Sequence, residues 1–148
     1  MDEDQIFDLI QRCKHLKYYF VGIYGADNFP LNLEKDRFII VNSGKANTPG
    51  QHWLLLATTS YPGMMYYADP LGFPINYYAD VQSRINAHPT SLAVTNLIQG
   101  KEPLQSLNSQ MCGLFCIYIA HFLYNKQFFQ IPQISEIQLL DFLRHMYD

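Results

Sequence analysis

Residues 110–124 constrain the fold of this 148-residue chain more than any other segment. Apolar side chains cover almost every side of a helix drawn through them, and a helix without a polar face is a buried one. Asn108 and Ser109, just before it, offer a helix cap. We therefore predict a central helix packed against a sheet. The segment's apolar residues are Met111, Leu114, Phe115, Cys116, Ile117, Tyr118, Ile119, Phe122 and Leu123.

The strands predicted to accompany this helix are short and bounded by turn residues. Arg37–Asn42 has the composition of one strand. His52–Thr59 and Met64–Asp69 are two apolar runs separated by Ser60–Gly63, which contains Pro and Gly, so we expect them to form an antiparallel hairpin. Leu92–Ile98 is a further expected strand.

Helices are expected around the sheet. Residues 2–16 place apolar side chains at helical spacing, and residues 75–86 also have a helical pattern. Ser135–Gln138 is a capping box that starts a last helix. The mixed order of elements predicts an α+β fold, with the central buried helix packed against a mostly antiparallel sheet. We expect one domain over residues 1–148.

Composition narrows the class of protein. Hydrophobic residues make up 49% of the chain and charged residues 16%, which is typical of a globular domain. The net charge is −3, and Arg12, Lys14 and Lys17 form only a modest basic group, so charge gives no case for strong DNA or RNA binding. No apolar run approaches the length of a membrane-spanning helix, and the acidic first residues lack a signal core. We expect neither membrane association nor secretion.

Cys112 is the strongest candidate for chemistry. It falls in the first turn of the central helix, where unpaired N–H groups and the helix dipole favour a thiolate. The flanking amides suit an oxyanion, and Gly113 leaves room for a substrate backbone. An inert buried thiol fits the same position, and Cys116, one turn on, is expected to be structural. With Cys13 the chain has three cysteines, an odd number that favours reduced thiols. No adequate set of further metal ligands accompanies Cys112 and Cys116, so we expect no metal or other cofactor.

A nucleophilic cysteine needs a base, and His52 is the best placed of the five histidines. It opens the first strand of the expected hairpin, and Asp69 ends the second, so the two residues should be neighbours. Asp69 is expected to accept the Nδ1–H of His52 and thereby present Nε2 to the thiol. A turn-forming Asp before Pro70 is the alternative interpretation.

Gln105 lies in the loop that leads to the central helix. Its amide is suited to donate to an oxyanion alongside the Cys112 N–H, although a loop Gln is equally consistent with ordinary surface. The remaining histidines fit structural roles better than catalytic ones; they are His15, His88, His121 and His145.

These residues together resemble the adenain family, the maturation proteases of adenoviruses. The segment Gln105–Cys116 (QSLNSQMCGLFC) matches the active-site segment of that family. Further segments agree in order: Tyr19–Gly22 with Phe29-Pro30, Ile40–Asn42, Gly50–Trp53 and Tyr67–Phe73. The resemblance runs from about Tyr18 to His121. Its order of His, acid, Gln and Cys is shared with the clan that holds the SUMO- and Nedd8-specific proteases.

The resemblance implies an adenain-like cysteine protease fold and a role for each residue. Cys112 is implied as nucleophile, His52 as base and then acid, Asp69 as orienter and Gln105 as oxyanion donor, and Gly50, Trp53 and Gly113 as substrate contacts. The implied reaction is cleavage of viral capsid precursor proteins inside the virion or infected cell, by a monomer. Related proteases also occur in virophages and Polinton-type transposons.

The chain departs from the family in three respects. The acid is Asp where mammalian adenoviral enzymes commonly have Glu. The chain is acidic, whereas the family's enzyme is basic and stimulated by DNA. The segment Leu92–Ile98 lacks the cysteine by which that enzyme attaches an activating peptide through a disulfide. Neither form of activation therefore carries over to this chain from the resemblance. Two other hypotheses remain: a protease that removes ubiquitin-like modifiers, and a binding module that kept the fold without the chemistry.

Overall fold

The computed structural model describes residues 2–44, 52–61, 63–88, 93–98, 103, 111–125 and 131–147. Within them the chain forms five strands, five α-helices and a short 3₁₀ helix. In chain order these are α1 (Glu3–Arg12), α2 (Lys14–Lys17), β1 (Phe20–Tyr24), β2 (Phe38–Asn42), β3 (Trp53–Ala57), β4 (Met64–Ala68), η1 (Ile75–Tyr77), α3 (Ala79–Asn86), β5 (Ala93–Asn96), α4 (Cys112–Tyr124) and α5 (Glu136–Tyr147).

The five strands form one sheet in the order β1-β2-β3-β4-β5. β3 pairs with both β2 and β4 in antiparallel fashion, so the predicted hairpin is confirmed. The two outer pairs, β1 with β2 and β4 with β5, are parallel, so the sheet is antiparallel at its centre and mixed as a whole. Each parallel pair is joined by a long connection, which a parallel pair requires; the one from β4 to β5 contains α3.

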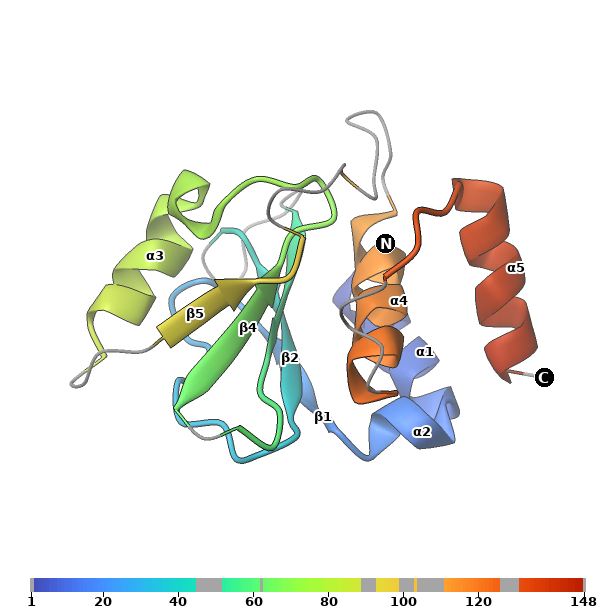
Figure 1. Cartoon of the computed structure of the whole chain (residues 1–148), viewed down its shortest axis with the longest axis horizontal. Helices are drawn as coiled ribbons and strands as arrows, with labels where there is room; N and C mark the ends of the chain where they lie inside the picture. Colours follow the sequence, from blue (N-terminus) through green and yellow to red (C-terminus); the bar gives the residue numbers. More distant parts are fainter. Residues whose placement is uncertain are drawn as a thin grey trace.

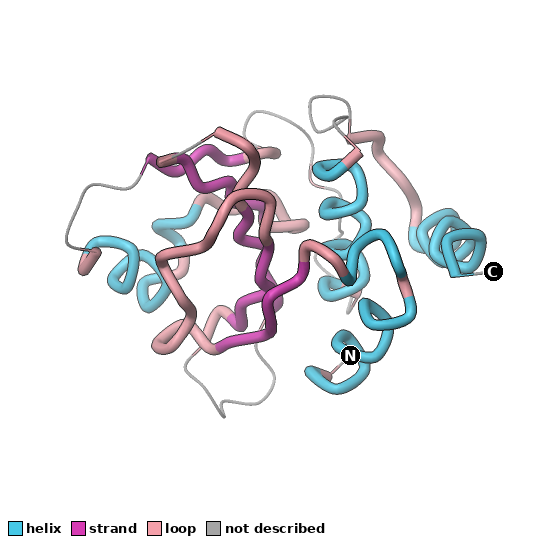
Figure 2. The backbone as a smooth tube through the Cα atoms, turned by 90° about the horizontal axis from the view of Figure 1, so that it is seen from below, coloured by secondary structure: helices cyan, strands magenta, loops and turns pink. Residues whose placement is uncertain are grey.

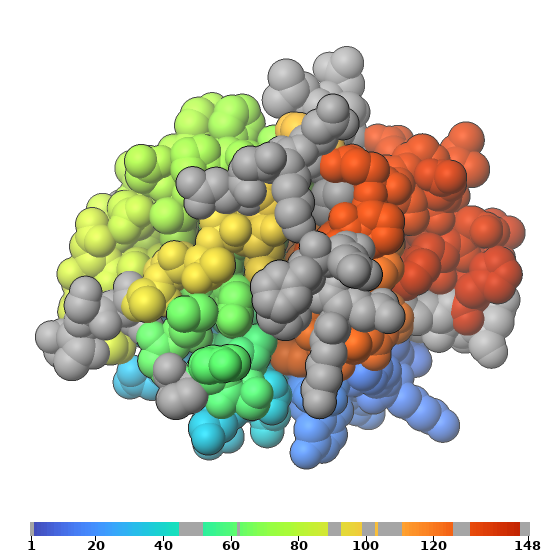
Figure 3. Space-filling view, in the orientation of Figure 1, coloured from blue at the N-terminus to red at the C-terminus, as the bar shows by residue number. Residues whose placement is uncertain are grey.

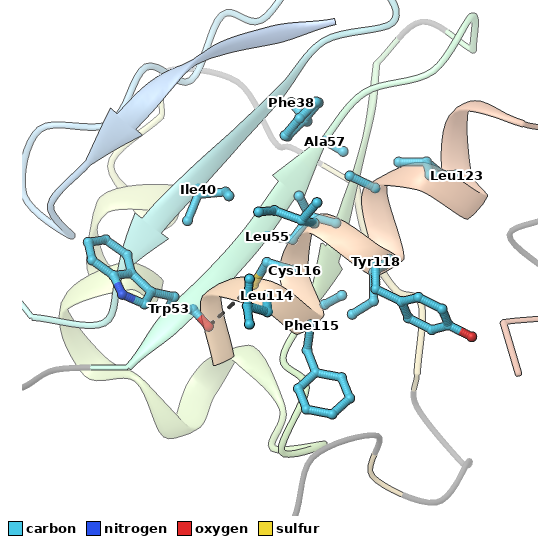
Figure 4. Packing of buried hydrophobic residues seen from close by; sticks show 14 of the residues in the cluster. Phe38, Ile40, Trp53, Leu55, Ala57, Leu114, Phe115, Cys116, Tyr118 and Leu123 are labelled. Carbon is cyan, nitrogen blue, oxygen red and sulfur yellow. Dashed lines mark hydrogen bonds between the residues drawn. The ribbon is translucent and has the colours of Figure 1, made fainter. Parts of the chain in front are cut away.

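Helices cover both faces of the sheet, with α3 on one side and α4, α1, α2 and α5 on the other (Figures 1 and 2). Alternate residues of the central strands enter separate cores, because side chains alternate between the two faces of a strand. The core beneath α3 receives Ile39, Val41, Leu54, Leu56, Met65 and Tyr67. The core beneath α4 receives Phe38, Ile40, Leu55, Ala57, Tyr66 and Ala68, several of them shown in Figure 4. The α+β class with a buried central helix is thus confirmed.

The central helix α4 begins at Cys112. Its N-cap is Met111, which makes no side-chain capping bond, so the helix begins later than a cap at Asn108 or Ser109 predicts. Asn108 and Ser109 themselves lie outside the described residues.

The capping box predicted for the last helix is confirmed. Ser135 Oγ accepts from the Gln138 N–H at 3.1 Å, and Gln138 Oε1 accepts from the Ser135 N–H at 2.9 Å. The helix it opens, α5, lies at the opposite end of the molecule from α3 (Figure 3). No described helix combines the length and the apolar composition needed to cross a membrane.

Candidate active site

His52 and Asp69 are in direct contact at one end of the β3–β4 hairpin. His52 precedes the first residue of β3, and Asp69 follows the last residue of β4. His52 Nε2 lies 2.5 Å from Asp69 Oδ1. The predicted neighbourhood of the two residues thus follows from the antiparallel pairing, which brings the start of one strand beside the end of the next.

The nitrogen in that contact differs from the expectation. Nε2, not Nδ1, faces Asp69, which leaves Nδ1 as the ring nitrogen available to the thiol. Strand pairing decides which residues are neighbours, but the side-chain rotamer of His52 decides which nitrogen turns toward each one. The chemistry is unchanged in kind, because either nitrogen of an imidazole can donate while the other accepts.

The Asp69 carboxylate is fully buried and accepts from four groups. Oδ1 accepts from His52 and from the Leu71 N–H at 2.9 Å. Oδ2 accepts from the Phe73 N–H at 3.3 Å and from the Tyr78 hydroxyl at 2.5 Å. A buried charge is tolerated when it is paired and hydrogen-bonded in this way. The bond to Leu71 is the turn-forming contact of the alternative interpretation, so Asp69 both shapes the turn and reaches His52.

Cys112, the first residue of α4, is hydrogen-bonded to His52. The first bond within the helix runs from the Phe115 N–H to the Met111 carbonyl. The N–H groups of Cys112, Gly113 and Leu114 therefore have no acceptor within the helix. The positive end of the helix dipole lies at the same place and favours a negative sulfur.

The thiol of Cys112 is acidified by its neighbours. Burial by itself raises its pKa. Hydrogen bonds from His52 and from the backbone N–H groups of Trp53 and Gly113, together with the charge of His52, outweigh burial and bring the pKa below its ordinary 9.0. A cysteine in such surroundings is the reactive kind, because the thiolate is the nucleophile.

The imidazole of His52 shifts in the complementary direction. Burial by itself lowers its pKa, but the hydrogen bonds to Asp69 and Cys112, and the negative charge of both, raise it from 6.5 to about 9. Near neutral pH the arrangement therefore favours a thiolate beside an imidazolium. This is the state in which a cysteine nucleophile is activated by an adjacent histidine.

The remaining predicted site residues divide into two groups. Gln105 and Gly50 lie outside the described residues. Trp53 is only 8% exposed and belongs to the core beneath α4, so it offers the site its backbone N–H more than its ring. Gly113 is buried in the first turn of α4, and its N–H reaches the Cys112 sulfur.

Tyr78 belongs to the site but was not a predicted member of it. It stands between η1 and α3, donates to Asp69, and its ring stacks on His52 with the ring centres 6.1 Å apart. No motif marks it, because a tyrosine in a predicted helix gives no indication that its hydroxyl reaches back to the end of β4.

The other cysteines play a different part. Cys116 is fully buried, its Sγ contacts the Trp53 carbonyl at 3.5 Å (Figure 4), and burial raises its pKa well above 9.0. Cys13 is also buried, and all three cysteines are free thiols. Across the described part of the chain, no three His, Cys, Asp or Glu side chains are grouped so as to hold a metal ion.

The comparison with protein families agrees with this geometry. The family model described as adenovirus endoprotease matches residues 20–145, a span that runs from the start of β1 into α5. The chain belongs to the adenovirus endoprotease family.

Adenoviral relatives of this endoprotease family support the assignment. The chain is 34% identical over 113 residues to the protease of bovine adenovirus 2, which covers 70% of this chain and 54% of that protein. It is 31% identical over 119 residues to the protease of frog adenovirus 1, which covers 74% and 58%. The chain thus spans about half the length of the curated relatives that it matches.

Solved structures share the fold of this family member. A protease of ASFV superposes with a TM-score of 0.54 at 12% identity, covering 99% of this chain and 67% of that one. ChlaDub1 from Chlamydia trachomatis superposes with a TM-score of 0.57 at 13% identity, covering 99% and 89%. At these identities the likeness concerns the fold alone.

Proposed function

We propose that this chain is a cysteine endopeptidase that cleaves viral structural precursor proteins during capsid maturation. The observation that carries the proposal is the chain of contacts from Cys112 through His52 to Asp69. Docking alone has no need of an acidified thiol paired with a histidine that is itself held by a buried carboxylate. Membership of the adenovirus endoprotease family points to the same reaction.

The reaction begins with the thiolate of Cys112. The sulfur attacks the carbonyl carbon of the scissile peptide bond, and the electron pair of the carbonyl moves to oxygen. The Cys112 N–H, which lacks an acceptor within α4, is positioned to donate to this oxyanion. Gln105 is proposed as the second donor, on the strength of the family resemblance.

His52 then serves as acid and as base. Its imidazolium gives a proton to the leaving nitrogen as the C–N bond breaks, which leaves a thioester on Cys112. The neutral imidazole next takes a proton from water, and the resulting hydroxyl attacks the thioester and releases the acid product. Asp69 holds the ring in place throughout, and its negative charge favours the imidazolium.

The proposed substrates are the structural precursors of the virus or related element that encodes the chain. The proposed places of action are the virion and the interior of the infected cell. We propose that the chain works as a monomer, without a metal or other cofactor.

The direct test is incubation of the purified protein with structural proteins from its own genome, followed by mass spectrometry of new termini. New internal termini are expected with the unaltered protein. Cys112→Ala should abolish them, whereas Cys13→Ala, which removes a buried thiol at the end of α1, should leave them.

Two results would redirect the proposal. Cleavage by Cys112→Ala would exclude the thiol mechanism. Activity on fluorogenic substrates that carry a ubiquitin-like C-terminus, with none on the structural precursors, would instead support removal of modifiers.

A further inference from the structure

Tyr78 touches both residues that support the nucleophile. Its hydroxyl donates to Asp69 Oδ2 at 2.5 Å. Its ring stacks on that of His52, with the ring centres 6.1 Å apart and the planes inclined by 26°. The residue sits between η1 and α3, where the chain changes from one helix to the next. Its side chain therefore reaches the catalytic pair from an element separate from both strands of the hairpin.

The two oxygens of Asp69 are held unequally. Oδ1 has His52 at 2.5 Å and the Leu71 N–H at 2.9 Å. Oδ2 has the Phe73 N–H only at 3.3 Å, at the long end of the normal range, and Tyr78 at 2.5 Å. Among the described residues, the Tyr78 hydroxyl is thus the main tether of Oδ2.

This tether does not compete with His52 for charge. Burial, followed by the hydrogen bond to Asp69, raises the pKa of Tyr78, so the phenol keeps its proton at every pH where the pair operates. A neutral donor fixes the orientation of the carboxylate while leaving its negative charge available to the imidazolium. Hydrogen bonds to charged groups of this kind are about twice as strong as neutral ones.

We propose that Tyr78 is a positioning residue of the proteolytic site: by holding Asp69 Oδ2, it keeps Oδ1 turned toward His52 and so maintains the thiolate–imidazolium pair. The inference rests on the proposed function for its meaning, but not for its test. When the tether is lost, the carboxylate turns toward the peptide groups of the loop. The contact between Asp69 and His52 then weakens, and the imidazolium loses its proton at lower pH.

The test compares Tyr78→Phe with the unaltered protein and with Tyr77→Phe. Tyr77 is the neighbouring phenol, 62% exposed, and its ring stacks on Phe73, so the control removes the same atom from an adjacent position. The readout is the pH dependence of Cys112 alkylation by iodoacetamide, followed by intact mass, together with an NMR titration of His52. Neither measurement needs a protein substrate.

Tyr78→Phe is expected to lower the pH at which His52 loses its proton by about 0.5 to 1 unit, which is roughly a three- to tenfold change in the imidazolium-to-imidazole ratio. In the peptidase assay, kcat is expected to fall about tenfold with KM nearly unchanged, because the tether acts on the reacting groups and not on substrate binding. Tyr77→Phe should match the unaltered protein in each measurement.

An unshifted or upward-shifted His52 titration in folded Tyr78→Phe would overturn the inference. If that variant does not fold, 3-fluorotyrosine at position 78 replaces it as the test. Its more acidic hydroxyl changes the strength of the bond to Asp69 without removing it, so the pH of the His52 transition should shift, and an unchanged transition would count against the tether. If Tyr78→Phe lowers the His52 transition as expected but the unaltered protein cleaves no precursor, the role of Tyr78 is upheld and the peptidase proposal is rejected.

Discussion

At the scale of single residues, the Asp69 carboxylate is the group on which the site depends most. It is fully buried, and its negative charge is matched by four donors that include His52. Asp69→Asn keeps the shape but removes the charge that favours the imidazolium. We expect kcat to fall by about 10²- to 10⁴-fold, the range typical of an acid–base contribution. Steady-state kinetics on a cleaved precursor peptide, with a circular dichroism spectrum to confirm folding, measures this.

The same residues predict the pH dependence of the reaction. The rate should rise with pH as Cys112 ionises, at a pH below the ordinary thiol value of 9.0, since its pKa is lowered. It should fall again near pH 9, where the raised pKa of His52 is passed and the acid that protonates the leaving group is lost. A profile of kcat/KM that rises only above pH 9 would contradict the ion pair.

The residues of the site were predictable to different degrees. His52 and Asp69 could be paired from sequence because one lies at the start of the first hairpin strand and the other at the end of the second. Antiparallel pairing alone makes these two positions neighbours. The choice of Nε2 over Nδ1 depends on a rotamer, which no sequence pattern records. Tyr78 was missed because its contact with Asp69 depends on how the chain turns between η1 and α3.

At the scale of elements, α4 combines the proposed nucleophile at its first residue with a body that is buried almost throughout. Ile117 is fully buried in the hydrophobic core around α4. Ile117→Ala should lower the free energy of unfolding by about 2 to 5 kcal/mol, through lost burial and the cavity it leaves. Urea unfolding followed by fluorescence measures this.

A matched control for that prediction lies on α5. Ile137 is 81% exposed, so Ile137→Ala removes the same atoms where they contact little. It should change the free energy of unfolding by no more than about 0.5 kcal/mol. If the two variants lost the same free energy of unfolding, burial of α4 in the core would not explain its contribution to stability.

Most of the helices and strands were predictable from the sequence. An all-apolar helix and short apolar strands bounded by turns have few alternatives, and α4 and the β3–β4 hairpin appear where they were expected. The parallel pairing of β1 with β2 was not predictable, because strand direction at a sheet edge depends on the path of the connecting loop. The N-cap of α4, at Met111, was likewise not predictable, because a sequence pattern places the end of a helix only to within a few residues.

At the scale of the whole molecule, a contact between two histidines joins the N-terminal helices to α4. His15 and His121 meet edge to face with ring centres 5.5 Å apart, near Tyr19 and Phe142. His15 Nε2 and His121 Nδ1 are buried and have no hydrogen-bond partner among the described residues. Burial, and then the proximity of His15, lower the pKa of His121 below 6.5.

This pair predicts how stability depends on pH. Because the folded pKa of His121 is below its unfolded value of 6.5, the unfolded chain binds more protons below that pH. Its contribution to stability is therefore complete above pH 6.5 and is lost as the pH falls toward the folded pKa. Urea midpoints measured between pH 8 and pH 5 should decline below 6.5, and His121→Gln should make that decline shallower.

The control for this prediction is His145→Gln, since the side chain of His145 is 78% exposed. It should retain the decline of the unaltered protein. If His121→Gln and His145→Gln gave the same slope, the acid sensitivity would come from groups other than the buried pair.

The most direct test of the central claim, that Cys112 is a nucleophile activated by His52, is site-resolved labelling with a thiol-directed peptide electrophile. The folded protein is treated near pH 7 and mapped by peptide mass spectrometry, alongside a folded His52→Ala variant. One label is expected, at Cys112, and its rate of formation should fall by at least about 100-fold without the histidine. Labelling at Cys13 or Cys116 in preference to Cys112, or an unchanged rate in His52→Ala, would contradict it.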